Sequence, residues 1–213
     1  MLIQYRKFDE DELIVVGVDT AAGGNDYCAA QFLSKTKLDV PMVYHSKTLA
    51  SEMTPVVFEQ LEKIYEETKI PPVVAYERNN GGVFEMERLA SLNRLNKFRR
   101  FVMPTFGSTV NPEARKLGWT TSTATRPKML ADLKEVVDNH LIKIYDKCTI
   151  EEMFSFIVSQ TSTAWKAQAE RGSHDDLIFA LAIAWQLQQS AISETVITSI
   201  DLPDDTKKFQ GWY

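Results

Sequence analysis

Acidic residues stand at three places where predicted buried elements begin or end. Asp19 ends the β-branched run LIVVGV, which predicts a strand buried on both faces. Glu77 ends the apolar run VVAY, another predicted strand, and Asp175 and Asp176 open an apolar helix. If the first and fourth predicted strands are sheet neighbours, Asp19 and Glu77 would lie close enough to share an ion. The helix would bring a third carboxylate to the same edge of the core.

Converging carboxylates of this kind indicate a site for hard divalent cations. Three carboxylates brought together repel one another unless cations bind between them. Mg²⁺ and Mn²⁺ suit such oxygen-rich sites, because they keep several waters and take one or two carboxylates each plus phosphate oxygens. Two such ions roughly 3.5–4 Å apart can activate a water and stabilise the leaving oxygen of a phosphodiester. The chemistry predicted for these residues is therefore two-metal phosphodiester hydrolysis.

Each of these acids also has a purely structural interpretation. Asp19 could cap a turn, and Asp175 with Asp176 could be N-cap and first-turn acids that the helix dipole favours. His174 could bind or shuttle at the metal site or cap the same helix, and both alternatives stay open. Asp26 fits the end of a glycine turn, with an outer-sphere metal contact as its alternative. Three acids at three buried element ends are harder to ascribe to capping than one alone.

The order of predicted elements defines the fold class. Strands are predicted over residues 13–18, 27–33, 41–47, 73–76, 99–103 and 141–145, and helices over 54–68, 82–95, 125–141 and 174–187, with another starting near 149. Strands first, then strands alternating with helices, predict an α/β fold: a mixed sheet with helices on both faces. We expect an N-terminal extension (1–12), one domain (13–192) and a C-terminal tail (193–213).

Cap residues mark two of the helix starts. Thr54 followed by Pro55 predicts an N-cap and a first-turn proline. Thr149 and Glu152 have the spacing of a capping box, in which a glutamate bonds back to the N-cap residue of its own helix.

Composition limits the class of protein. The 213 residues are 44% hydrophobic and 25% charged, as in soluble globular proteins, and the net charge of −5 argues against bulk coating of nucleic acid. The longest apolar run, residues 177–187, is far short of the roughly 20 residues that span a bilayer, and the N-terminus lacks a signal-peptide pattern. Cys28 and Cys148 are too few for a disulfide framework or a four-cysteine zinc site. We therefore expect a soluble, intracellular protein with no membrane partner.

Four segments carry a further signal: GVDTAAGGND (17–26), YERNNGG (76–82), LGWTTSTATRPKML (117–130) and GSHDDLIFALA (172–182). In this order they resemble the nuclease domain of the terminase large subunits of tailed phages. The resemblance implies a ribonuclease H-like fold of the RuvC-like superfamily and metal-dependent endonuclease cleavage of double-stranded viral DNA with little sequence preference. It also implies a place in the genome-packaging motor, in the host cytoplasm, beside the portal and the small terminase subunit.

The resemblance also implies roles for individual residues. Asp19 would bridge two Mg²⁺ or Mn²⁺ ions, Glu77 would bind one, and the His-Asp-Asp segment would supply the remaining ligand, Asp176 being favoured over Asp175. Full-length members carry an ATPase domain with a phosphate-binding loop, whose pattern G-x-x-x-x-G-K-[ST] is absent from this sequence. We therefore expect the nuclease portion alone, a monomer in isolation that neither hydrolyses ATP nor translocates DNA.

Basic residues beside one of these segments are candidate DNA contacts. Arg115, Lys116, Arg126 and Lys128 flank GWTTSTATRP. The hydroxyl groups of that segment could add neutral donors to the same phosphate backbone.

The same residues allow three rival interpretations. A Holliday-junction resolvase would use the same carboxylates but cut branched DNA as a dimer, largely ignoring a linear duplex. The segment DTAAGG looks like the first phosphate loop of actin-like sugar kinases and ATPases, but a second D-x-G strand-turn is missing. A non-catalytic DNA-binding module of the motor would have no reason to keep three mutually repelling acids.

Overall fold

A mixed β-sheet forms the centre of the protein. The computed structural model describes residues 1–21, 26–79, 81–95, 97–103, 116–160, 165–169, 174–190 and 196–197. Within them the strand order is β1-β4-β3-β2-β5-β6-β11, with β7 beside β6 and β8 beside β4. The strands of this sheet are β1 (Leu2–Gln4), β2 (Ile14–Asp19), β3 (Cys28–Ser34), β4 (Asp39–Ser46), β5 (Val73–Tyr76), β6 (Arg99–Met103), β7 (Lys116–Leu117), β8 (Lys143–Ile144) and β11 (Val196–Ile197).

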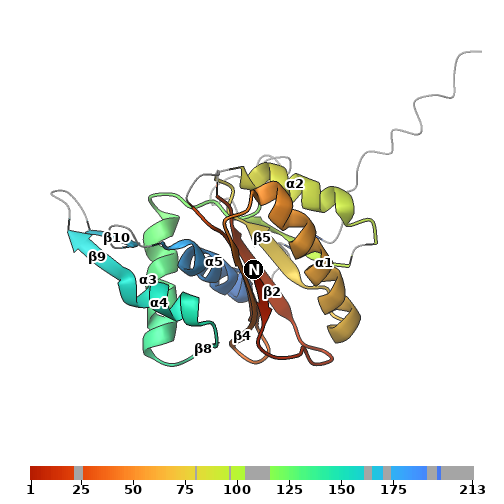
Figure 1. Ribbon diagram of the computed structural model, residues 1–213, viewed down its shortest axis with the longest axis horizontal. Helices are drawn as coiled ribbons and strands as arrows, with labels where there is room; N and C mark the ends of the chain where they lie inside the picture. The colour runs from red at the N-terminus through yellow and green to blue at the C-terminus, as the bar shows by residue number, and fades with distance from the viewer. Residues whose placement is uncertain are drawn as a thin grey trace, which may run out of the picture.

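Helices cover both faces of this sheet (Figure 1). One face carries α1 (Ala50–Thr68) and α2 (Gly82–Leu92), and the other carries α3 (Thr125–Asp138), α4 (Lys147–Ser155) and α5 (Asp176–Ser190). Strands β2, β3 and β4 form an antiparallel meander, whereas β5 pairs with β2 in parallel and β6 with β5 in parallel. The predicted α/β class, a mixed sheet flanked by helices on both faces, is confirmed.

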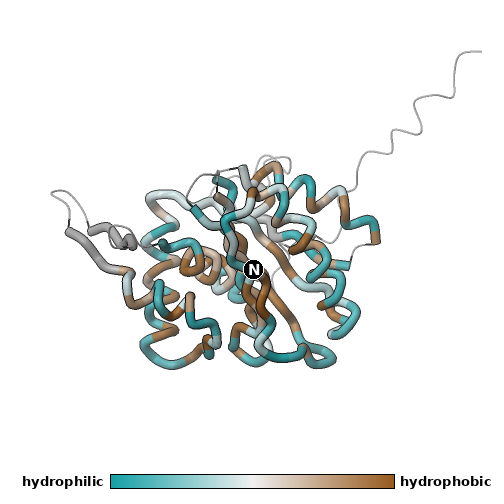
Figure 2. Tube along the Cα trace, in the orientation of Figure 1, coloured by the Kyte–Doolittle hydropathy of each residue, from teal (hydrophilic) through white to brown (hydrophobic). Residues whose placement is uncertain are grey.

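The sheet is buried on both faces because its central strands are apolar throughout. Alternate side chains of a strand point to opposite faces, so Val15 packs on the α5 side while Val16 and Val18 pack on the α1 side. Figure 2 shows the resulting brown band along the middle strands, between helices whose outer surfaces are mostly teal. Residues 177–187 of α5 are buried almost all round, as expected for a central helix.

The backbones of α5 and β2 touch directly at Gly17. A Cβ atom placed on Gly17 would lie 2.1 Å from the carbonyl oxygen of Ala180 and 2.4 Å from the nitrogen of Ala184. Only glycine permits this approach. The first turns of α5 are thereby held against the strand that ends at Asp19.

Helix α1 begins earlier than the sequence predicts. It starts at Ala50, so Pro55 lies inside the helix rather than in its first turn, and Thr54 is not the N-cap. A proline within a helix leaves one carbonyl without its amide partner. That carbonyl belongs to Ser51, and it accepts a hydrogen bond of 2.7 Å from Nη1 of Arg88 in α2. A contact with another helix thus compensates for the interior proline.

Strands also occur where the sequence predicts none. Residues 2–4 of the expected extension form the edge strand β1, and residues 196–197 of the expected tail pair with β6. After α4, β9 (Phe156–Gln160) and β10 (Trp165–Ala169) form an antiparallel hairpin that extends away from the main body (Figure 1). The proposed domain bounds stay a prediction. No helix among the described residues is long and apolar enough to cross a membrane.

Candidate metal centre

Strand alternation directs Asp19 and Glu77 to the same face of the sheet. Asp19 continues the series of Val15 and Gly17, which faces α5, and Glu77 continues the series of Val73 and Ala75, which faces the same way. Strands β2 and β5 are parallel neighbours, with Val18 opposite Tyr76. The amide of Glu77 donates a hydrogen bond of 2.7 Å to the carbonyl of Val18. The expected adjacency of the first and fourth predicted strands is therefore present.

Helix α5 brings two more acids to this edge. Asp176 is its first residue, and Asp175 precedes it. Together with Asp19 and Glu77 they line one pocket of 740 Å³. This acidic pocket is also lined by Asp26 and His174, so the structure brings together all six of the acidic and histidine candidates that the sequence singled out. The adjacent glycines Gly23 and Gly24 lie outside the described residues.

The two acids at the strand ends are deeply buried, and no described basic residue pairs with them. Asp19 is 9% exposed and Glu77 is 7% exposed. Among the described residues, no lysine or arginine forms an ion pair with either of them. Burial, the charge of Glu77 and a hydrogen bond to Glu77 raise the pKa of Asp19 well above its ordinary range, and Asp176 and Asp175 raise it further. Such carboxyl groups either keep a proton or bind a cation.

The pKa of Asp176 is raised for similar reasons. Burial, followed by the charge of Asp175, raises its pKa to about 6, although His174 and the backbone amide of Tyr27 act in the opposite direction. Its Oδ2 atom is buried and accepts no hydrogen bond from the described residues. A buried carboxylate oxygen without a donor is costly. The oxygen set of Asp19, Glu77 and Asp176 therefore fits a hard divalent cation.

Two candidates lie at the rim of this arrangement. Nδ1 of His174 lies 3.6 Å from Oδ2 of Asp176, and the His174 ring packs edge-on against Tyr27 at 4.8 Å between ring centroids. This geometry is compatible with a shuttle or ligand role for His174 and leaves the capping alternative open. Asp26 lines the pocket, and its outer-sphere role stays a prediction.

The candidate DNA-binding residues occupy different positions. Arg126 lines the acidic pocket, with its guanidinium 4.3 Å from the ring centroid of Phe179 and 3.7 Å from Oδ2 of Asp175. Lys128 is 67% exposed and lies 2.7 Å from Oδ2 of Asp132. Lys116 belongs to β7, and Arg115 lies outside the described residues.

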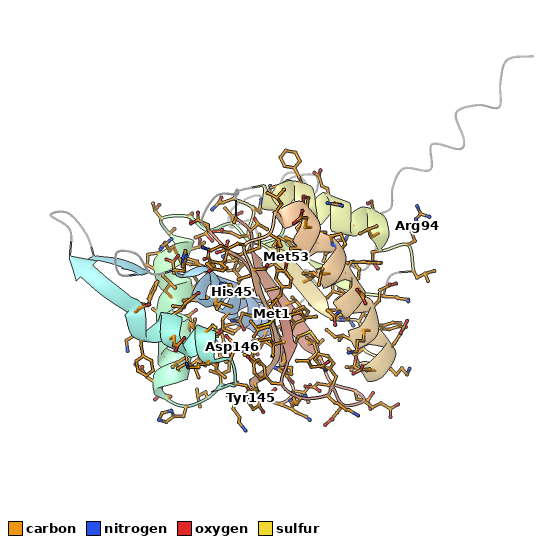
Figure 3. All side chains as sticks on the ribbon, in the orientation of Figure 1. Met1, His45, Met53, Arg94, Tyr145 and Asp146 are labelled. Carbon is orange, nitrogen blue, oxygen red and sulfur yellow. The ribbon has the colours of Figure 1, made fainter. Side chains whose placement is uncertain are left out.

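Sequence reasoning missed two residues that lie close to Asp176. His45, Glu152 and Asp176 have potential ligand atoms within 4.8 Å of one another, and Nε2 of His45 is 3.9 Å from Oε1 of Glu152. His45 lies on the α4 side of the sheet (Figure 3). Burial raises the pKa of Glu152 to about 8, assisted by the charge of Asp176, and burial lowers the pKa of His45 to about 4. Nothing in the local sequence pattern indicated this grouping, because it joins three distant segments.

The predicted capping box of Thr149 and Glu152 is wrong. The N-cap of α4 is Asp146, whose Oδ2 accepts a hydrogen bond of 2.7 Å from the amide of Thr149. Glu152 does not bond back to Thr149; its Oε2 instead accepts hydrogen bonds from Leu177 and Ile178 of α5. The N-cap of α4 lies three residues before the predicted one, which leaves Glu152 free to reach a neighbouring helix.

Known families and curated proteins give no match to this sequence. Solved structures do. The large terminase nuclease of thermophilic phage G20c with bound magnesium is similar with a TM-score of 0.62 at 14% sequence identity, over 87% of this chain and 86% of that chain. The large terminase nuclease domain of Thermus phage P74-26 gives 0.59 at 14% identity, over 87% and 85%. The manganese-soaked human cytomegalovirus terminase nuclease domain gives 0.56 at 12%, over 92% and 96%. This chain therefore has the ribonuclease H-like fold of terminase nuclease domains, as predicted.

Proposed function

We propose, from the fold shared with terminase nuclease domains, that this chain is a metal-dependent endonuclease that cuts double-stranded viral DNA during genome packaging. The observation that carries the proposal is the acidic pocket. Asp19, Glu77 and Asp176 come from three distant segments and converge there, and no basic residue of the described part of the chain pairs with the two strand-end acids. Buried acids arranged in this way destabilise a fold, so a ligand role accounts for them better than a structural one.

In this proposal each acid has a distinct task. Asp19 would be a ligand of both divalent ions, Glu77 would bind one, and Asp176 would supply the third carboxylate. Bound Mg²⁺ or Mn²⁺ would lower the pKa of a water and stabilise the leaving oxygen of the phosphodiester. Asp176 is favoured over Asp175 because its buried Oδ2 accepts no hydrogen bond from the described residues, whereas the side chain of Asp175 is 31% exposed beside Arg126.

Asn79 supports the geometry of the pocket. Its Nδ2 donates a hydrogen bond of 3.2 Å to Oε1 of Glu77. This bond restrains one carboxylate oxygen of Glu77. We assign Asn79 an orienting role toward Glu77.

DNA would approach across Arg126 and the hydroxyl-bearing residues at the pocket edge, Thr121, Ser122 and Thr123. Contacts to phosphate give affinity with little sequence preference. Arg115, Lys116 and Lys128 stay predicted phosphate contacts. The proposed setting is the host cytoplasm, with the ATPase domain of the large subunit, the portal and the small terminase subunit as partners.

The decisive test replaces Asp19 by alanine. We expect Asp19→Ala to reduce Mn²⁺- or Mg²⁺-dependent nicking of plasmid DNA by at least about a thousand-fold, roughly 4 kcal/mol of transition-state stabilisation. The matched control is Asp138→Ala, since Asp138 is 58% exposed on α3 beside Lys134. Circular dichroism should give the same fold for both variants. Nicking by Asp19→Ala at the wild-type rate would remove Asp19 from the mechanism.

The same assay separates the rivals. An endonuclease of the packaging type should cut a linear duplex and a four-way junction of equal length at similar rates. A strong preference for the junction would favour a resolvase. Binding of duplex DNA by the wild type without cleavage at any Mn²⁺ concentration would favour a non-catalytic module.

A further inference from the structure

The N-terminus of α5 is capped by a side chain from another helix. The amide of Phe179 donates a hydrogen bond of 3.0 Å to the carbonyl of Asp175, so Asp175 occupies the N-cap position. The amides of the second and third helical residues, which an N-cap side chain commonly satisfies, are those of Leu177 and Ile178. Both donate to Oε2 of Glu152, at 3.0 and 3.4 Å. Glu152 therefore performs in α5 the task usually left to the N-cap residue.

Glu152 is buried where an extra acid is unfavourable. It is 8% exposed and lies beside Asp176. A buried carboxylate next to another acid is repelled, and the helix N-terminus offsets this only in part through its amides and dipole. The arrangement favours the acidic pocket. Because Glu152 caps the helix from outside, the side chains of Asp175 and Asp176 are not needed as caps.

The helix that carries Glu152 is itself held in place by buried hydrogen bonds. Oγ1 of Thr149 in α4 donates to Oδ2 of Asp146 at 2.7 Å. Nε2 of Gln31 in β3 donates to Oγ1 of Thr149 at 2.8 Å and to the carbonyl of Leu177 at 3.3 Å. Strand β3, helix α4 and the start of α5 are thus joined in one network that sets where Glu152 meets α5.

We propose that Glu152 is a positioning residue that fixes the start of α5 and so holds Asp176 toward Asp19 and Glu77. The inference rests on the proposed function, since the geometry that it maintains is that of the metal centre. Glu152 acts through the backbone of Leu177 and Ile178, and its neutral or charged carboxyl group touches neither substrate nor reacting atoms in this scheme.

The test compares four variants. Glu152→Ala removes the cap, Glu152→Gln keeps an acceptor oxygen of the same reach without charge, and Glu152→Asp keeps the charge but shortens the side chain. Glu151→Ala is the matched control, since Glu151 is the adjacent residue of α4, 60% exposed beside Lys147. Mn²⁺ affinity is measured by calorimetry, and the Mn²⁺ concentration for half-maximal nicking is measured separately.

We expect Glu152→Ala to weaken Mn²⁺ affinity and to raise the half-maximal Mn²⁺ concentration by about 10–100-fold. Glu152→Gln should stay within about threefold of the wild type, because an amide oxygen can accept the same two hydrogen bonds. Glu152→Asp should behave like Glu152→Ala, and Glu151→Ala like the wild type. Hydrogen exchange at the amides of Leu177 and Ile178, measured without metal, should accelerate in the alanine and aspartate variants only.

The outcomes separate the two proposals. Unchanged Mn²⁺ affinity in Glu152→Ala with a lowered melting temperature would reduce Glu152 to a structural role and overturn the inference. If Glu152→Ala does not fold, the Mn²⁺ affinities of Glu152→Gln and Glu152→Asp decide. A higher affinity in Glu152→Asp than in Glu152→Gln would overturn the inference. Wild-type protein that binds Mn²⁺ without cutting DNA would refute the proposed function while Mn²⁺ affinity still tests Glu152. Wild-type protein that binds no Mn²⁺ would refute both.

Discussion

Two buried groups of acids in this protein differ in whether a basic side chain neutralises their charge. In the arginine cluster, Arg6 lies between Glu12 and Asp39, which are 1% and 5% exposed, and its Nε donates to Oδ2 of Asp39 at 2.7 Å. In the acidic pocket, Asp19 and Glu77 are buried to a similar degree without a basic partner among the described residues. Burial alone therefore does not distinguish the two groups, whereas the presence of a protein cation does.

The pKa shifts express this difference. Burial acts to raise the pKa of Glu12, but hydrogen bonds and the charge of Arg6 outweigh it, and the pKa of Glu12 falls below its ordinary value. In the acidic pocket, burial and neighbouring acids act together, and the pKa of Asp19 rises. A lowered pKa marks acids that stabilise the fold as anions, whereas a raised pKa marks acids that either keep a proton or bind a cation.

The largest effect should come from removing the cation of the arginine cluster. We expect Arg6→Met to lower the free energy of unfolding by about 3–5 kcal/mol, because two buried carboxylates lose their partner. Urea unfolding followed by circular dichroism measures the loss. The control is Lys37→Met, which breaks an ion pair with the 61% exposed Asp9 and should cost at most about 1 kcal/mol. Equal losses in the two variants would contradict the distinction drawn between buried and exposed pairs.

A smaller, opposite effect should follow from adding a cation to the acidic pocket. Mn²⁺ at about a hundred times its Kd should stabilise the protein by about 2.7 kcal/mol, raising Tm by roughly 5–10 °C. The folded-state pKa of Asp176 is raised from 3.8 to about 6. Its protonated form therefore contributes stability below pH 3.8 that is lost as pH rises through about 6.

The Mn²⁺-induced rise in Tm should consequently be larger near pH 7.5 than near pH 5, since the carboxylates must lose their protons to bind metal. Differential scanning calorimetry at the two pH values measures it. Asp138→Ala should keep the full shift, and Asp19→Asn should lose most of it. A shift that is independent of pH, or that survives in Asp19→Asn, would place the Mn²⁺ elsewhere on the protein.

The smallest effect on stability is expected for Arg126, the basic residue that lines the acidic pocket. Its pair with Asp175 is long, at 3.7 Å, and both side chains are about one-third exposed, so Arg126→Ala should change stability by less than about 1 kcal/mol. Its effect should appear in DNA binding, where the slope of log K against log salt should fall by about 0.9. Lys134→Ala, on the same helix and 69% exposed, is the control. An unchanged salt slope in Arg126→Ala would show that Arg126 does not contact phosphate.

Much of the fold follows from local patterns in the sequence. The β-branched run before Asp19 forms the doubly buried strand β2, and the apolar run VVAY forms β5 with Glu77 directly after it. Helix α5, apolar all round, is central as expected. The candidate acids at the strand ends lie in one pocket, because parallel neighbouring strands end at the same edge of a sheet.

The remaining features depend on partners far away in the sequence. Glu152 has a local capping-box spacing, but the chain starts α4 at Lys147 and uses Asp146 as the cap, so the glutamate bonds to α5 instead. The interior position of Pro55 depends in the same way on Arg88 of another helix. A capping or proline pattern identifies which groups need partners, and only the packed fold decides which groups supply them.

The backbone contact at Gly17 joins the strand and the helix that carry acids of the proposed metal centre, without any side chain at position 17. Gly17 is two residues before Asp19, and Ala180 is four residues after Asp176. A methyl group at position 17 would push helix α5 away from strand β2. Asp176 would then move away from Asp19, although no carboxylate would be altered chemically. The distance between the acids, and with it the capacity to hold a cation, thus depends on glycine having no side chain at position 17.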